Sequence, residues 1–102
     1  MGSIESAKKL FQSLRVGNVT LSHRVVLAPL SRFRADISLT PTALMEDYYA
    51  QRASVPGTLL ISEGTFVAAQ AAGFGQAPGI WNDEQIAGWK KVLSMYCLIL
   101  IS

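Results

Sequence analysis

Residues 25–29 read VVLAP, and residues 58–62 read TLLIS. The first run begins with β-branched residues and stops at Pro29, which has no N–H to donate to a sheet. The second run follows a chain-breaking Pro-Gly pair and is ended by Glu63 and Gly64. Short apolar runs of this kind are typical of strands that are buried on both faces of a parallel sheet. The two runs therefore predict two buried, parallel strands.

The segment between the two runs predicts a helix. Thr40 and Pro41 form a good start signal, because threonine caps helix N-termini and proline fits the first helical position. Residues 44, 48 and 51 then form one stripe at helical spacing, so we expect the helix to end near Ala53. A strand, a helix and a strand joined by short connections imply a parallel pair with a right-handed crossover.

Two further elements flank this unit. Residues 14–21 predict a hairpin, because the glycine and asparagine at 17–18 tolerate the positive φ of a two-residue turn. Asn82 and Gln85 form a capping-box pattern, which starts a second helix over residues 83–92. Two parallel strands still need further neighbours and cover on both faces. The order of elements thus predicts the opening part of an α/β fold.

Composition excludes several classes of protein. The chain has 102 residues, of which 50% are hydrophobic and only 16% are charged, so disorder of the whole chain is excluded. A net charge of +2 is too small for a nucleic-acid-binding stripe or a polybasic membrane patch. The single cysteine, Cys97, excludes a disulfide scaffold and favours a reducing compartment. We therefore expect a cytoplasmic protein with no nucleic-acid or membrane partner.

Targeting segments are not evident either. The first residues lack the apolar core of a signal peptide. The most apolar run, residues 92–101, is about half the roughly 20 residues that a membrane helix needs.

A nearly continuous series of motifs resembles the old yellow enzyme family, which are flavin-dependent ene-reductases built on a TIM barrel. The resemblance covers residues 10–92 and has one length change near residues 36–40. The amino-acid sequence is most like that of fungal members of the family. It implies an α/β fold holding the first two βα units of a TIM (β/α)8 barrel, preceded by the hairpin that closes the barrel's N-terminal mouth. The motifs that carry it are Val16-Gly17-Asn18, residues 21–35, residues 48–53, residues 56–65, Ala77-Pro78-Gly79-Ile80-Trp81 and residues 85–89.

The resemblance divides the chain into three parts. We expect a flexible N-terminus at residues 1–9, the barrel part at residues 10–92 and a divergent apolar tail at residues 93–102. Family members continue instead into a third strand that carries a flavin-contacting glutamine and a tryptophan. A TIM barrel needs about 250 residues. We therefore expect a truncated product or a gene model in which intron sequence or a frameshift supplies the last ten residues.

The resemblance also implies which positions face a cofactor. Flavin mononucleotide (FMN) lies across the C-terminal ends of the barrel strands in the family. Pro29 and Ser31 match positions against the isoalloxazine, and Gly64 matches a position where a missing side chain lets the flavin approach. Phe74 matches an aromatic residue at the substrate mouth. No catalytic residue is assigned, because the matched stretch does not include the family's proton-donating tyrosine or the His/Asn or His/His pair that holds the carbonyl oxygen. No metal ligand is assigned either, because the sequence shows no metal-binding cluster.

Other polar residues have simpler interpretations. His23 precedes a buried strand, and we interpret it as a structural residue at the bottom of the barrel, a face associated with stability. Arg32 and Arg34 follow a strand end and would allow phosphate contact, although the family binds phosphate mainly through its last strands. Glu63 stands without a partner in the sequence, so it does not form an acid/base pair. We expect it to hold a loop or a helix terminus.

Two functions remain open at this point. The resemblance implies an oxidoreductase that uses NAD(P)H and FMN to reduce α,β-unsaturated carbonyl compounds, with no activity expected of this chain alone. The alternative is a non-catalytic truncated product or interaction fragment. Such a fragment would associate with itself or with another barrel fragment through exposed strand edges.

Overall fold

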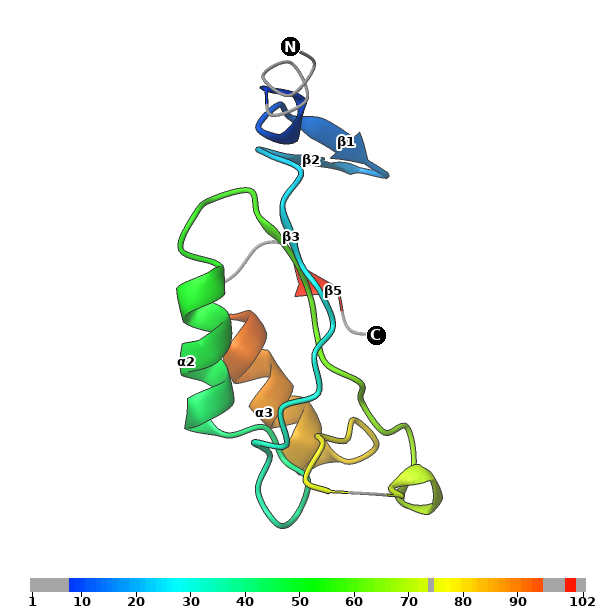
Figure 1. The fold of residues 1–102 in the computed structure, drawn as a ribbon. Coiled ribbons are helices and arrows are strands. Elements are labelled where there is room, and N and C mark those ends of the chain that lie inside the picture. Colours follow the sequence, from blue (N-terminus) through cyan, green and yellow to red (C-terminus); the bar gives the residue numbers. More distant parts are fainter. Residues whose placement is uncertain (1–7, 74, 95–98, 101–102) are drawn as a thin grey trace.

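The computed structural model describes residues 8–73, 75–94 and 99–100, and Figure 1 shows its arrangement. A hairpin lies at one end, and two helices lie side by side on one face of a small sheet. The elements in chain order are β1 (Leu14–Val16), β2 (Val19–Leu21), β3 (Val26–Leu27), α2 (Ala43–Arg52), β4 (Leu59–Ile61), the 3-10 turn η1 (Ala69–Ala71), α3 (Asp83–Leu93) and β5 (Ile99–Leu100).

The sheet is parallel throughout and has the order β3-β4-β5. Val26 pairs with Leu59 and Leu27 pairs with Leu60, which confirms the predicted parallel pair. The third strand was not expected, because residues 93–102 read only as a divergent tail. Ile99 nevertheless pairs with Leu60 in parallel register. The described residues therefore form two strand-helix units and one further short strand, and they do not close into a barrel.

The expectation that both faces of the strands are buried is wrong for the described residues. Side chains alternate between the two faces of a strand. Leu60 faces the helices and is only 1% exposed, whereas Val26 is 38% exposed. The physical reason is that α2 and α3 cover a single face (Figure 1), so the opposite face has no layer against it.

The hairpin forms as predicted, with Val16 opposite Val19 across a turn in which Gly17 has φ +59°. Two hydrogen bonds join the end of the hairpin to the segment that precedes β4. The Ser22 amide donates to the Gly57 carbonyl at 3.0 Å, and the Ser22 hydroxyl donates to the Pro56 carbonyl at 2.7 Å. Gly57 has φ +80°, and a Cβ there would lie 2.8 Å from Ser22 Cβ, so only glycine fits this junction.

Helix α2 begins two residues later than predicted, and its N-cap is Thr42 instead of Thr40. Asp36 is the reason. Its carboxylate accepts hydrogen bonds from the amides of Ser38 and Thr40, at 2.8 and 2.9 Å, and so holds residues 36–40 in a turn. The Thr42 hydroxyl donates to the Arg34 carbonyl at 2.7 Å and makes no cap bond.

Helix α3 starts as predicted. The Gln85 amide donates to the Asn82 side chain at 2.9 Å, and the Gln85 side chain accepts from the amides of Trp81 and Asn82. Both halves of the capping box are present, which satisfies amides that have no partner inside the helix. Gln85 is fully buried, so this cap also anchors the loop before α3 to the core.

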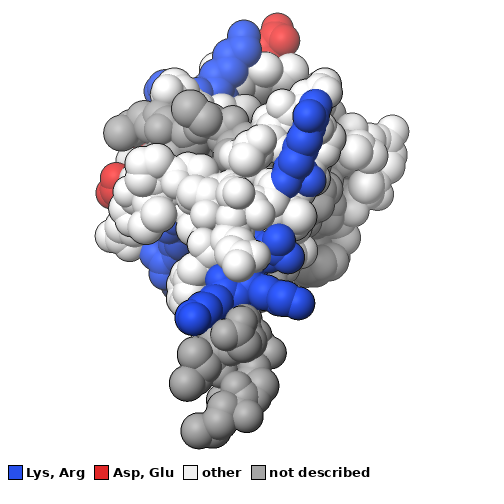
Figure 2. Space-filling model, turned by 90° about the horizontal axis from the view of Figure 1, so that it is seen from above, with Lys and Arg blue, Asp and Glu red and all other residues white. Residues whose placement is uncertain are grey.

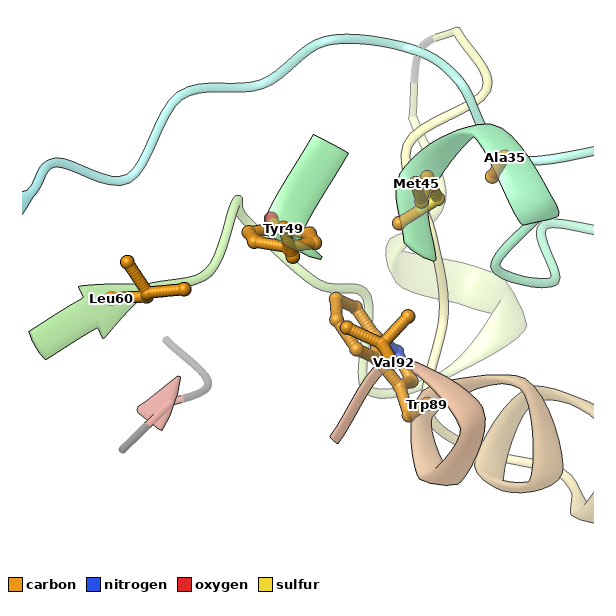
Figure 3. Close-up of a cluster of buried hydrophobic side chains, with 6 residues drawn as sticks. All are labelled: Ala35, Met45, Tyr49, Leu60, Trp89 and Val92. Atoms are coloured by element: carbon orange, nitrogen blue, oxygen red, sulfur yellow. The ribbon is translucent and has the colours of Figure 1, made fainter. Parts of the chain in front are cut away.

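The core lies between the two helices and the sheet (Figure 3). Trp89 of α3 packs against Tyr49 of α2, with ring centroids 6.3 Å apart, and its indole N–H donates to the Gly79 carbonyl at 3.1 Å. Leu60 contributes the sheet side of this cluster. Six buried residues make up the cluster: Ala35, Met45, Tyr49, Leu60, Trp89 and Val92.

Helix α3 closely approaches the segment that precedes α2 at Gly88. A Cβ at this position would lie 2.9 Å from Pro41 Cδ and 3.2 Å from the Pro41 carbonyl oxygen. Gly88→Ala is therefore expected to lower the free energy of unfolding by about 1–3 kcal/mol through overpacking. The better helix propensity of alanine, about 1 kcal/mol, opposes this loss. Urea unfolding measures the difference. Gly73→Ala is the control, because its Cβ would meet only the Ala71 carbonyl at 3.9 Å. A Gly88→Ala chain that is more stable than the parent would contradict the close approach.

The molecule is more open than a compact domain of the same size. Its radius of gyration is 15.7 Å, whereas a compact chain of this length would have about 13 Å. Its accessible surface is 6583 Å², against about 5600 Å² for a folded protein of its mass. Large apolar side chains such as Phe11 and Val67 are 68% and 74% exposed. Among the helices of the described residues, none is long and apolar enough to cross a membrane.

Candidate functional site

The C-terminal ends of β3 and β4 meet at one edge of the sheet, because the two strands are parallel. Ser31 follows β3, and Gly64 follows β4. A Cβ built on Gly64 would lie 3.8 Å from the Ser31 hydroxyl oxygen, so these two predicted residues lie side by side. Pro29 precedes Ser31 on the same segment, and all three residues are exposed.

The surface at Gly64 is open. Among the described residues, only the Ser31 hydroxyl oxygen would come within 4 Å of a Cβ at Gly64. A flat group placed here would meet backbone and a hydroxyl instead of bulky side chains. The hydroxyl can both donate and accept a hydrogen bond. This edge can therefore hold the rim of a planar, polar ring system.

A buried pair of polar side chains supports the end of β4. The Tyr49 hydroxyl donates to Glu63 Oε2 at 2.9 Å and accepts from the Glu63 amide at 3.0 Å. Glu63 is 1% exposed, and its other oxygen, Oε1, accepts no hydrogen bond from the described residues. The pair ties α2 to the residue that directly precedes Gly64.

This contact corrects the expectation that Glu63 has no partner. Sequence reasoning missed it because Tyr49 is 14 residues away and belongs to another element. The sequence nevertheless held a signal for this contact. Tyr49 lies on the buried side of its helix, and Glu63 comes just after the strand that follows that helix. Glu63 holds the strand end through Tyr49.

Burial governs the ionisation of both members of this pair. It raises the pKa of the Glu63 carboxyl above its ordinary value, and the Tyr49 hydrogen bond together with the amide and charge of Arg32 opposes the shift. Burial also raises the pKa of Tyr49 far above its ordinary value. Tyr49 therefore stays neutral in the folded chain and acts as a hydrogen-bond donor to the carboxyl group.

The raised pKa of Glu63 predicts how stability depends on pH. The folded chain holds the Glu63 proton more tightly than the unfolded chain does, so stability is highest where the group is protonated in both states. We expect the free energy of unfolding to fall, by up to about 1.4 kcal/mol per pH unit, as pH rises from the ordinary pKa of glutamate to the raised one. Urea unfolding at several pH values measures this slope.

Two variants isolate the contribution of Glu63. Glu63→Gln keeps an acceptor for the Tyr49 hydroxyl and cannot ionise, so the fall with pH should be largely lost. Glu84→Gln removes an exposed carboxyl group in the first turn of α3 and should leave the slope in place. An unchanged slope in Glu63→Gln would show that the Glu63 carboxyl does not cause it.

Arg32 and His23 have contact partners other than Ser31 and Gly64. The Arg32 guanidinium lies over the ring of Tyr48, 4.3 Å from its centroid, on the α2 side of the chain. His23 lies at the opposite end of the strands, where Nε2 contacts the Thr58 hydroxyl at 2.8 Å and Nδ1 accepts from the Val25 amide at 3.1 Å. His23 thus joins the segment before β3 to Thr58, and its structural role stays a prediction.

Phe74, the predicted substrate-mouth residue, lies outside the described residues, as does Cys97. The residues around position 74 can be placed, however. The Ala35 amide donates to the Gln76 carbonyl at 3.1 Å, and a Cβ on Gly75 would lie 2.6 Å from the Phe33 ring. The loop that contains residue 75 is thus fixed against the segment that follows β3.

Comparisons with known proteins find relatives that match most of the chain. The model of the NADH:flavin oxidoreductase / NADH oxidase family matches residues 9–95. The chain is 56% identical over 84 residues to chanoclavine-I aldehyde reductase fgaOx3 of Penicillium roqueforti, an alignment that covers 82% of this chain and 23% of that protein. It is 50% identical over 88 residues to the probable inactive reductase easA of Epichloe festucae var. lolii, covering 86% of this chain and 23% of that protein.

A solved structure shows the same arrangement of elements. Morphinone reductase in complex with tetrahydroNAD aligns with a TM-score of 0.80 and 42% identity, covering 90% of this chain and 26% of that chain. The chain thus spans about a quarter of the length of the proteins that it matches.

Proposed function

Because the chain belongs to the NADH:flavin oxidoreductase / NADH oxidase family, which includes the old yellow enzymes, we propose that Pro29, Ser31 and Gly64 form one edge of an FMN site. The observation that carries this proposal is the approach of Ser31 and Gly64 at two adjacent strand ends. The missing side chain at Gly64 leaves room for a flat ring, and the exposed Ser31 hydroxyl supplies a hydrogen bond to its rim. The residues present therefore fit one side of a flavin.

Each of the three residues has a separate role in this proposal. Ser31 hydrogen-bonds the polar rim of the isoalloxazine and so adjusts how readily it accepts electrons. Gly64 allows close approach, and Pro29 provides a rigid apolar contact. When bound, FMN supplies the transfer of hydride from a nicotinamide to a substrate. Tyr49 and Glu63 act on this edge only indirectly, by holding the end of β4.

The proposed reaction is the NAD(P)H-dependent reduction of an α,β-unsaturated carbonyl compound, carried out by a complete barrel. Matches to aldehyde and morphinone reductases support this substrate class, and a tetrahydroNAD complex of one of them supports a nicotinamide reductant. We place Phe74 at the substrate mouth and the protein in the cytoplasm. No catalytic residue is proposed within this chain.

Replacement of Ser31 tests the FMN edge. We expect FMN to quench protein fluorescence saturably and Ser31→Ala to weaken that binding by about tenfold, the value of one hydrogen bond. Ser38→Ala is the control, since Ser38 is equally exposed but lies in the turn held by Asp36. Equal affinities in all three chains would contradict contact between Ser31 and the flavin.

A second candidate function is self-association, and a specific observation favours it. Within the described residues β3 forms an outer strand of the sheet, and its Val26 and the preceding Val25 are 38% and 47% exposed. Unpaired, apolar edges of this kind invite pairing with another strand. Sedimentation velocity distinguishes the two functions: a monomer that binds FMN supports the flavin site, and a dimer that does not bind FMN supports the interaction fragment.

A further inference from the structure

A buried carboxyl group connects the two segments of chain that carry the proposed flavin contacts. Glu63 directly precedes Gly64 and is 1% exposed. The Tyr49 hydroxyl donates to Glu63 Oε2 at 2.9 Å, and the backbone amide of Arg32 also hydrogen-bonds this carboxyl group. Arg32 directly follows Ser31. One carboxyl group therefore links the residue beside Gly64 to the residue beside Ser31.

The main chain of Glu63 is also fixed by hydrogen bonds. Its amide donates to the Tyr49 hydroxyl at 3.0 Å, and its carbonyl accepts from the Thr65 hydroxyl at 3.0 Å. Gly64 lies between Glu63 and Thr65 and has no side chain that could anchor it. The position of Gly64 therefore depends on the hydrogen bonds of its two neighbours.

Arg32 is fixed at two points on the segment after β3. Its amide bonds the Glu63 carboxyl group, and its guanidinium lies 4.3 Å from the centre of the Tyr48 ring. The pairing of β3 with β4 ends at Leu27 and Leu60, so the bond between Arg32 and Glu63 joins the two segments beyond the sheet. The spacing between Ser31 and Gly64 therefore depends on this bond.

We propose that Glu63 is a positioning residue for the flavin, whose carboxylate form holds the Ser31 hydroxyl and the Gly64 backbone at the spacing that the ring requires. This inference rests on the proposed FMN edge. Glu63 is buried, whereas Ser31 and Gly64 are exposed, so it acts through its neighbours and does not contact the ring. A site that is already ordered loses less entropy when its ligand binds, and it therefore binds more tightly.

The ionised form of Glu63 holds its two donors more strongly than the neutral form does. A carboxylate only accepts hydrogen bonds, and bonds to a charged acceptor are roughly twice as strong as bonds to a neutral one. Protonation therefore weakens the bonds from the Tyr49 hydroxyl and the Arg32 amide. Because burial raises the pKa of Glu63, this change occurs above the ordinary value of a glutamate. FMN affinity should rise as pH rises through the raised pKa.

Stability and FMN affinity then respond to pH in opposite directions. Ionisation of the buried Glu63 carboxyl group lowers the free energy of unfolding, but it strengthens the two bonds that position Ser31 and Gly64. A residue with only a structural role would change affinity and stability in the same direction. Opposite trends over one range of pH are therefore the sign of a positioning role.

Other ionisable groups near Glu63 must be distinguished from it. Arg32 faces it from the segment after β3, and Tyr49 faces it from α2. The other ionisable groups that line the same cavity are Arg34, Asp47, Tyr48 and Arg52. Residues 8–35, which include Ser31, contain six Lys or Arg and no Asp or Glu, and Figure 2 shows more basic than acidic side chains on the face at the hairpin end. Asp47 is therefore the matched control for Glu63.

Titration of FMN at several pH values, followed by quenching of protein fluorescence, tests the role of Glu63. Glu63→Gln keeps an acceptor for both donors and cannot ionise. The ratio of the parent's affinity to that of Glu63→Gln should rise by about tenfold over the range of pH in which the parent loses stability. This ratio is independent of the titration of the FMN phosphate, which is common to both chains. Asp47→Asn should follow the parent. A ratio that stays constant or falls overturns the role of Glu63.

Hydrogen exchange without flavin separates failure of this role from failure of the FMN edge. In Glu63→Ala the Arg32 amide should exchange at least about tenfold faster than in Glu63→Gln, relative to the amides of α3 in the same chain. Equal relative rates overturn the positioning role. A parent chain that binds no FMN at any pH overturns the FMN edge instead, and the exchange rates still show whether Glu63 holds Arg32. Circular dichroism confirms that each variant is folded.

Discussion

Replacing Trp89 with alanine is expected to lower the free energy of unfolding by about 3–5 kcal/mol, the largest stability effect available in this chain. The indole is 2% exposed, packs against Tyr49 and donates to the Gly79 carbonyl. Its loss would leave a cavity between the helices and an unpaired carbonyl. A domain of this length has a total stability of only about 5–15 kcal/mol. The substitution should therefore remove a large fraction of the total stability.

Urea unfolding followed by far-ultraviolet circular dichroism measures this effect without relying on tryptophan fluorescence, to which Trp81 also contributes. Ile86→Ala is the matched control on the same helix, because Ile86 is 38% exposed and its truncation should cost less than about 1 kcal/mol. Trp89→Phe keeps an aromatic ring but removes the hydrogen bond to Gly79. Its loss in the free energy of unfolding should lie between the losses of Trp89→Ala and Ile86→Ala. Similar losses for Trp89→Ala and Ile86→Ala would contradict the position of the core.

The second large effect concerns flavin binding. Gly64→Leu should reduce FMN affinity by about 100-fold or more, because its side chain would occupy the space where the ring approaches. The fold should survive, since even the Ser31 hydroxyl would be 3.8 Å from the new Cβ and the position is exposed. The variant thus separates loss of cofactor from loss of structure.

Flavin fluorescence and an unfolding curve should be recorded for the same Gly64→Leu sample. Ala87→Leu adds similar bulk at an exposed position of α3 and should leave FMN affinity unchanged. Unaltered FMN binding by Gly64→Leu would show that the flavin does not lie against this edge.

Local signals predicted the fold best. The hairpin and the capping box depend on residues within a few positions of each other, and both formed at the predicted places. The start of α2 was predicted two residues too early, because Asp36 holds Thr40 in a turn and so keeps it out of the helix. Helix propensities alone do not account for this competition between turn and helix. Strand β5 was not expected, because its pairing with β4 depends on a contact between distant residues.

The candidate site was predicted unevenly for the same reason. Ser31 and Gly64 came from a resemblance, and parallel strand ends explain why they meet. The partnership of Glu63 with Tyr49 and the stacking of Arg32 and Arg52 on Tyr48 were missed. The contacts of Glu63 with Tyr49 and of Arg32 with Tyr48 join α2 to two strand ends, so they depend on the angle at which α2 packs, which residue spacing does not encode. Arg52 and Tyr48 lie four residues apart on α2, so their contact was predictable from spacing.

The narrow junction between the hairpin and the sheet unit has a consequence for how the molecule opens. Hydrogen bonds at Ser22 and the bond from the Arg24 amide to the Leu10 carbonyl lie at this junction, while the buried cluster lies beyond it. Local unfolding costs least where few buried contacts must break. We therefore expect the hairpin to open as a separate unit, with amides that exchange with solvent before those of β4. It can detach and re-form while the two-helix core stays intact.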